Sequence, residues 1–72
     1  MKQLQSKTRY IIGRRIAEIR KSKGMTAFRL SEKTGMNRQN ITRIELGKYS
    51  TGIDILGKIA DALNCDIDFI EK

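Results

Sequence analysis

The sequence predicts an all-α fold of five short helices, and two observations carry this prediction. Apolar residues recur at intervals of three and four along most of the chain, and no stretch alternates with a period of two. Glycines mark the boundaries between the expected helices, since the 72 residues include six glycines and no proline. A chain of this length forms one domain that buries about 60% of the surface its unfolded form exposes, so a partner subunit would help to stabilise it.

The helices are expected near residues 9–22, 26–33, 37–46, 52–63 and 66–71. The first four carry apolar stripes made by Ile12, Ile16 and Ile19, by Ala27, Leu30 and Thr34, by Ile41 and Ile44, and by Ile53, Leu56, Ala60 and Leu63. Side chains that accept hydrogen bonds from the free amides of a helix start precede four segments, at Thr26, Asn37, Thr51 and Asp66. Residues suited to left-handed C-terminal caps stand at Gly24, Gly35, Gly47 and Asn64.

The second and third helices are predicted to form a helix-turn-helix. The second ends at Gly35 and Asn37 caps the third, which leaves a turn of about three residues and forces the helices to cross steeply. Ser31 is small where the helices approach each other, Gly35 can adopt a positive φ, and Met36 can place an apolar side chain under the corner.

The third helix is predicted to have an apolar inner face and a polar outer face. At 100° per residue, Ile41 and Ile44 point one way with Glu45 beside them. The outer face carries Gln39, Thr42, Arg43 and Leu46, with Arg38 at the exposed first turn. The DNA major groove, about 12 Å wide, accepts one helix, and Arg and Gln suit the edges of guanine and adenine. Asn37 and Asn40, near the helix start, suit phosphate oxygens. An ordinary surface helix is the alternative, although such a helix more often carries Glu and Lys pairs.

Positive charge is concentrated in the first two thirds of the chain. Residues 1–50 contain thirteen Lys or Arg against three Glu, a balance of +10, and residues 51–72 contain two against five, a balance of −3. This asymmetry indicates a polyanionic partner, nucleic acid first and an anionic membrane second, against the alternative of a charged surface kept for solubility. Residues 1–8 are expected to form a basic N-terminal arm, and residues 9–72 the domain itself. No apolar run nears the ~20 residues of a membrane span and none follows the basic start as in a signal peptide, so a cytoplasmic location is expected.

Enzymatic chemistry has little support. The sequence has no histidine, and Cys65 is its one cysteine, so we expect a packing role for Cys65 rather than a nucleophilic one. Asp66 and Asp68 are explained more simply by helix capping than by acid-base catalysis. No catalytic residue, metal site, cofactor or small-molecule ligand is therefore predicted.

From Ile11 to Phe69 the sequence resembles the Cro and phage-repressor type of helix-turn-helix domain, a five-helix family of DNA-binding regulators. The segments that carry the resemblance are "IGRRIAEIRKSKGMT", "RLSEKTGMNRQNITRIELGK" and "IDILGKIADAL". The resemblance implies that Arg38, Gln39, Thr42 and Arg43 face bases, and that Asn37, Asn40, Lys48 and Tyr49 lie near phosphates. It also implies a structural ion pair between Arg20 and Glu45.

Three positions depart from the family pattern. Ala27 replaces a glutamine whose side chain contacts phosphate in the family, so that contact is not expected here. Thr34 replaces an apolar residue, and Thr51 stands where many relatives have proline. Phe28 lies off the main face of its helix and either packs at the edge of the core or is exposed.

The expected function is sequence-specific binding of double-stranded DNA by a transcriptional repressor, acting as a homodimer on a palindromic operator. Ile67, Phe69 and Ile70 form either the dimer surface or part of the monomer's own core. The alternative function is that of an antitoxin or protein-interaction module on the same fold, with a toxin or another regulator as partner.

Overall fold

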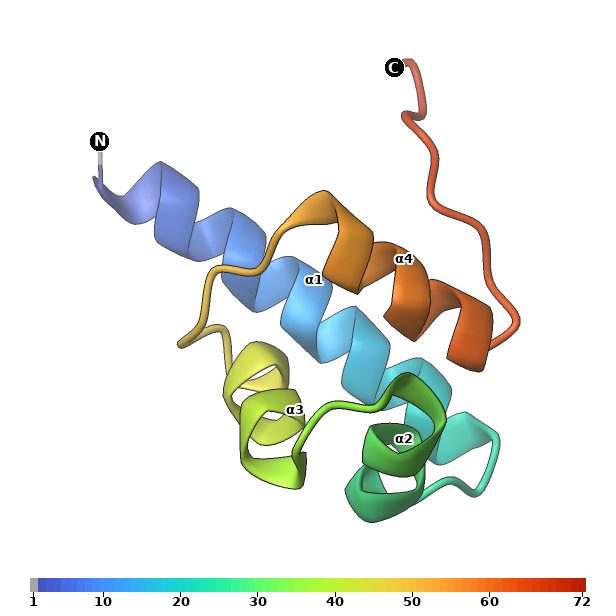
Figure 1. Ribbon diagram of the computed structural model, residues 1–72. Helices are drawn as coiled ribbons and strands as arrows, with labels where there is room; N and C mark the ends of the chain where they lie inside the picture. Colours follow the sequence, from blue (N-terminus) through green and yellow to red (C-terminus); the bar gives the residue numbers. More distant parts are fainter. Residues whose placement is uncertain (1) are drawn as a thin grey trace.

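The fold consists of four helices with no strand among residues 2–72, the part of the chain whose backbone the computed structural model describes; side chains are described for residues 7–72 (Figure 1). The helices are α1 (Lys2–Ser22), α2 (Ala27–Thr34), α3 (Arg38–Glu45) and α4 (Ile53–Ala62). The all-α class is thus confirmed, and the expected number of five helices is wrong.

The segment predicted to be a fifth helix, residues 66–71, has no regular secondary structure and extends from the end of α4 (Figure 1). Short helices depend on tertiary packing, and this segment has little, because Phe69 is 99% exposed and Ile70 is 89% exposed. Asp66 therefore caps no helix. The exposure also rules out the alternative in which Phe69 and Ile70 complete the monomer's core.

Two helix starts differ from the expected ones. α1 begins at Lys2 rather than near residue 9, because residues 2–8 contain no glycine or proline and extending an existing helix costs little. Residues 2–8 of the expected arm are therefore helical, while Met1 lies outside the described residues. Gly52, not Thr51, is the N-cap of α4, and the Thr51 hydroxyl is buried with no hydrogen-bond partner among the described residues.

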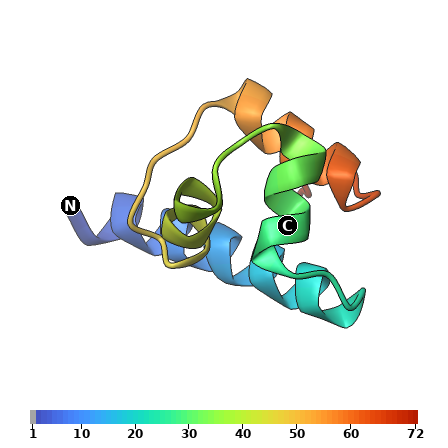
Figure 2. The ribbon, with the colours of Figure 1, turned by 60° about the horizontal axis from the view of Figure 1, so that its bottom comes forward.

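The core lies where the four helices meet. It consists of Ile16, Leu30, Ile41, Ile44, Ile59 and Leu63. α3 packs against α1 and α2, and α2 also packs against α4, an arrangement seen from two directions in Figures 1 and 2. Cys65 is half-buried against this core, in agreement with its expected packing role. Phe28 lies at the surface, with 57% of its area exposed.

Thr34 introduces a polar group into the interior without leaving it unsatisfied. Its hydroxyl donates a hydrogen bond to the carbonyl of Leu30 at 2.9 Å, and it accepts one from the amide of Met36 at 3.3 Å. A buried hydroxyl costs free energy only when it lacks such partners. The departure from an apolar residue at this position therefore keeps the turn between α2 and α3 intact.

Two glycines allow the backbone of α1 to approach α3 and the loop after it. A Cβ atom built on Gly13 would lie 2.2 Å from the carbonyl oxygen of Ile44. Gly47 has φ +74°, and a Cβ there would lie 2.8 Å from the Cα of Tyr10. Only glycine tolerates both the positive φ and the close approach of Tyr10 at this position. The loop after α3 is thereby held directly against α1.

Candidate nucleic-acid interface

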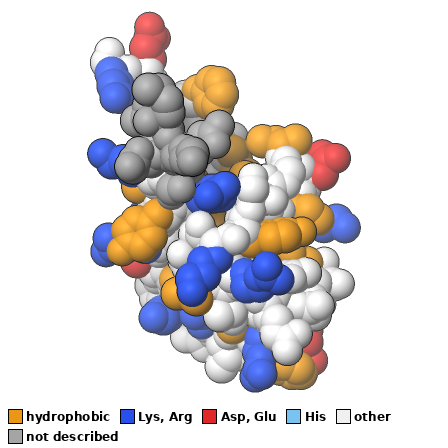
Figure 3. Space-filling model, turned by 90° about the vertical axis from the view of Figure 1, so that its left-hand side faces the viewer, with side chains coloured by type: hydrophobic (Ala, Val, Ile, Leu, Met, Phe, Trp, Pro, Cys, Tyr) orange, Lys and Arg blue, Asp and Glu red, His pale blue; other side chains and the backbone are white. Residues whose placement is uncertain are grey.

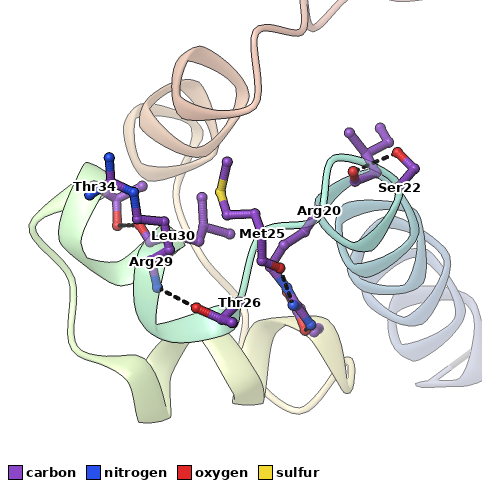
Figure 4. Close-up of polar contacts among 9 residues, drawn as sticks. Arg20, Ser22, Met25, Thr26, Arg29, Leu30 and Thr34 are labelled. Carbon is purple, nitrogen blue, oxygen red and sulfur yellow. Dashed lines mark hydrogen bonds and ion pairs between the residues drawn. The ribbon is translucent and has the colours of Figure 1, made fainter.

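The caps on both sides of the turn determine how α3 is presented. Thr26 accepts a hydrogen bond from the amide of Arg29 at 3.0 Å and so begins α2 (Figure 4). Gly35, at φ +74°, ends α2 with its amide bonded to the carbonyl of Ser31. Asn37 begins α3 by accepting from the amide of Asn40 at 2.9 Å. The predicted turn between α2 and α3 is confirmed, with Met36 packed against the core.

The ion pair expected between Arg20 and Glu45 is present and almost fully buried. Arg20 donates from Nε and Nη2 to the two carboxylate oxygens of Glu45 at 2.7 and 3.0 Å. Its remaining Nη1 donates to the carbonyl of Met25 at 2.8 Å, the contact drawn in Figure 4. The hydrogen bonds to Glu45 raise the pKa of Arg20 above its ordinary value. This pair joins the end of α1 to the end of α3 and also fixes the chain before α2.

α3 divides into the two faces that its sequence predicts. Ile41 and Ile44 are 1% and 3% exposed and belong to the core. The opposite side carries the four predicted base-facing residues, all of them exposed: Arg38, Gln39, Thr42 and Arg43. These four side chains line a single shallow depression at the surface. The structure therefore brings the predicted set together on one outward face.

Ala27 is the fifth residue that lines this depression, a location that the sequence alone did not indicate. As the first residue of α2, it faces the outward side chains of α3 across the turn. A methyl group fills little of the space in front of them, whereas the longer glutamine common in the family would reach into it. The departure from the family pattern was visible in the sequence, but its position beside α3 follows only from the fold.

The four predicted phosphate-facing residues lie at both ends of α3. Asn37 uses its side-chain oxygen as the cap of α3, which leaves only its amide nitrogen to donate to a phosphate. Asn40 is half-buried, and Lys48 is exposed in the loop after α3. Tyr49, which is 39% exposed, lies against Arg43: the Arg43 Cζ atom is 5.7 Å from the centre of the Tyr49 ring. The sequence alone did not indicate this contact between a base-facing and a phosphate-facing candidate.

Basic side chains surround this face of the molecule. Figure 3, which views the side on which α3 lies, shows Lys and Arg side chains spread across it and acidic ones near its margins. Lys7, Arg14 and Lys48 are exposed, although Arg14 also lies 3.9 Å from Glu18 and stacks on Tyr10. Within residues 2–72, no helix is both long enough and apolar enough to cross a membrane.

Comparison with known proteins yields a family and several relatives. A family model described as Helix-turn-helix matches residues 16–70. An uncharacterized HTH-type transcriptional regulator of Archaeoglobus fulgidus is 39% identical over 54 residues, which cover 75% of this chain and 77% of that protein. One from Methanothermobacter thermautotrophicus is 42% identical over 48 residues, or 67% of this chain and 70% of the relative.

The immunity repressor protein of Bacillus phage phi105 is also similar, at 32% identity over 59 residues. The similar region spans 82% of this chain but only 41% of the repressor. The family match covers most of the present chain, including the last third of α1, all of α2, α3 and α4, and the whole turn between α2 and α3. The chain therefore belongs to the helix-turn-helix family of the Cro and phage-repressor type, whose members are DNA-binding transcriptional regulators.

Proposed function

We propose that this protein is a repressor that binds a palindromic operator as a homodimer, with α3 of each subunit in the major groove. The observation that carries the proposal is the convergence of Arg38, Gln39, Thr42 and Arg43 on one exposed depression. Arg and Gln form bidentate hydrogen bonds with guanine and adenine, and Thr offers both a hydroxyl and a methyl group. Such a protein acts where the DNA is, which in a bacterial or archaeal cell is the cytoplasm.

Backbone contacts are proposed to flank the base-reading set. Asn37 and Asn40 lie at the start of α3, where free amides also attract phosphate, and Lys48 lies just past its end. Lys7 and Arg14 add sequence-independent attraction from α1. Affinity should fall with rising salt, with a logarithmic slope of about −0.9 per phosphate neutralised.

Substitution of Arg43 by alanine should relax base preference. If Arg43 reads one base pair, its loss costs ~1–3 kcal/mol on the operator and much less on random DNA. Lys48→Ala is the matched control, because loss of a phosphate contact weakens all sequences alike and makes the salt slope shallower by about one. Binding titrations on an operator selected from random DNA, at two salt concentrations, measure both effects. Equal losses on operator and random DNA for Arg43→Ala would remove it from the base-reading set.

The proposed homodimer uses the exposed C-terminal segment. An apolar groove runs between α1 and α4, lined by Ile12, Ile16, Leu56, Leu63 and the start of the segment itself, including Ile67. Phe69 and Ile70 lie beyond it, exposed, in a segment that also carries acidic residues, and Arg15 lies at the groove. Apolar burial and opposite charge together favour pairing of this region between two copies.

Phe69→Asp should therefore shift the protein toward monomer. Loss of a large apolar contact from a small interface is expected to weaken self-association at least tenfold, since burial of such a side chain contributes ~1.5–3 kcal/mol. Ile53→Asp is the control, because Ile53 is 71% exposed but lies at the far end of α4. Sedimentation equilibrium measures both variants. Unchanged self-association of the Phe69 variant would place the dimer contact elsewhere.

A further inference from the structure

We propose that Tyr49 is a positioning residue for Arg43: its ring holds the Arg43 guanidinium in place on the outer face of α3 and thereby sharpens base preference. The inference rests on the proposed base-reading role of Arg43. It assigns Tyr49 a function through its ring face, whereas the family resemblance implies a contact with phosphate.

The geometry of the loop after α3 fixes the ring close to the helix. The amide of Gly47 donates to the carbonyl of Ile44 at 3.0 Å, and the amide of Lys48 donates to the carbonyl of Arg43 at 2.9 Å. These two bonds, with Gly47 at φ +74°, form a Schellman motif that turns the chain back along α3. Tyr49 is the next residue, so its backbone is tied to that of the arginine it contacts.

A second anchor holds the same loop to α1. The position of a Cβ on Gly47 would be 2.8 Å from the Cα of Tyr10, which shows that the loop lies directly on the α1 backbone. The loop is thus held by α3 on one side and by α1 on the other. Tyr49 therefore extends from a loop whose backbone is held in place.

The ring restrains Arg43 without neutralising it. The Arg43 Cζ atom lies 5.7 Å from the ring centre, within the range of a cation–π contact. Within the described part of the chain, the ion pairs involve Arg14, Arg15, Arg20 and Arg29 but not Arg43. The guanidinium therefore keeps its donors for DNA. A long side chain that is already restricted loses less freedom on binding, which favours the base it is aligned to read.

Two substitutions of Tyr49 separate the ring from the hydroxyl. Tyr49→Phe keeps the ring face and removes the hydroxyl, whereas Tyr49→Leu removes the ring and keeps an apolar side chain. A positioning role requires the ring, while a phosphate contact requires the hydroxyl. Because Tyr49 is 39% exposed and outside the core, both variants should fold, and thermal unfolding followed by circular dichroism checks this.

The experiment measures dissociation constants of the full chain for its selected operator, for operators changed at each base pair, and for random DNA. The base pair that Arg43 reads is the one at which Arg43→Ala loses discrimination. There, Tyr49→Leu should lower discrimination by about two- to fivefold, the effect of an exposed cation–π contact, and leave random DNA unaffected. Tyr49→Phe should preserve discrimination, and Tyr49→Leu should have no further effect on discrimination in the Arg43→Ala protein.

Nuclear magnetic resonance supplies a readout that needs no DNA. The ring current of Tyr49 should shift the side-chain Nε–H resonance of Arg43 in the free protein, and this shift should persist in Tyr49→Phe and vanish in Tyr49→Leu. An Arg43 resonance that is the same in all three proteins would overturn the inference. So would equal, sequence-independent losses of affinity in both Tyr49 variants, which would assign the hydroxyl to phosphate.

Failure of the proposed function has a different signature. If the unsubstituted protein binds operator and random DNA equally, or if Arg43→Ala weakens both equally, base reading by Arg43 is wrong, whatever the Tyr49 variants do. If Arg43→Ala abolishes discrimination at one base pair but Tyr49→Leu leaves it intact, base reading stands and the positioning role alone is overturned.

Discussion

Gly13→Ala should destabilise the protein by about 1–3 kcal/mol, although alanine normally favours a helix over glycine by ~0.5–1 kcal/mol. The expected reversal of sign has a single cause. The new methyl group would lie 2.2 Å from the carbonyl oxygen of Ile44 and 2.8 Å from that of Glu45, both of which are backbone atoms that no rotamer change can move. α1 and α3 would have to separate, and the core residues between them would lose contacts.

Gly57→Ala is the matched control for this substitution. Gly57 also lies inside a helix, α4, but a Cβ there would meet no atom within 4 Å. Alanine should therefore stabilise the protein by about 0.5–1 kcal/mol through the entropy of the unfolded chain. Urea denaturation of the two variants measures both free energies of unfolding. A stabilised Gly13→Ala protein would show that the approach of α1 to α3 is less close than the structure has it.

Glu45→Ala should cost about 3 kcal/mol, because it leaves the buried guanidinium of Arg20 with the carbonyl of Met25 as its one remaining partner in the described part of the chain. The two side chains are 11% and 10% exposed, so water cannot easily replace the lost carboxylate. For a domain of this size, each kcal/mol lowers the melting temperature by roughly 4–8 °C. The expected fall is therefore large enough to leave the variant partly unfolded at physiological temperature.

Glu18→Ala removes the same side chain from an exposed pair and should change stability by less than ~0.5 kcal/mol. Glu18 lies 3.3 Å from Arg15, and 55% of its side chain is exposed. Calorimetric melting of both variants tests the contrast, and similar melting temperatures would contradict a structural role for the Arg20–Glu45 pair. A double variant, Arg20→Met with Glu45→Leu, should recover much of the loss, since neither charge is then left buried alone.

The charge of Arg20 should not change with pH over the ordinary range. The pKa of Arg20 is raised in the folded protein by its hydrogen bonds to Glu45. A group with a raised folded-state pKa stabilises the fold fully below its unfolded-state pKa, and the effect is lost only as the pH rises through the folded-state value. Arginine reaches neither value under ordinary conditions, so Arg20 keeps its charge.

The sequence predicted the elements whose periodicity and caps agree with each other. For α2 and α3, apolar spacing, a capping Thr or Asn and a following glycine all pointed to the same boundaries, and all four left-handed positions, including Asn64, have positive φ. The segment from Asp66 had a cap and apolar residues but nothing to pack against, which a local pattern cannot reveal. The start of α1 was misplaced because no cap marks it.

For the candidate interface, the sequence predicted which side of α3 faces outward, since Ile41 and Ile44 fix the inner side. It did not predict what lies beside that face. The contact of Tyr49 with Arg43 depends on the chain reversal at Gly47, and the place of Ala27 depends on the approach of α2 to α3. Gly13 could have been noticed as a glycine inside a helical pattern, a costly choice that usually has a packing reason.

The division of α3 into a buried and an exposed side has a consequence for how this molecule could change over time. Among the eight residues of α3, the side chains that pack into the core and those proposed to read bases belong to different residues. Exchanges on the exposed side should scarcely affect folding, as is usual for surface substitutions. Single substitutions on the exposed side of α3 could therefore change the DNA sequence that a descendant of this protein prefers. Such substitutions would not require a prior increase in the free energy of unfolding.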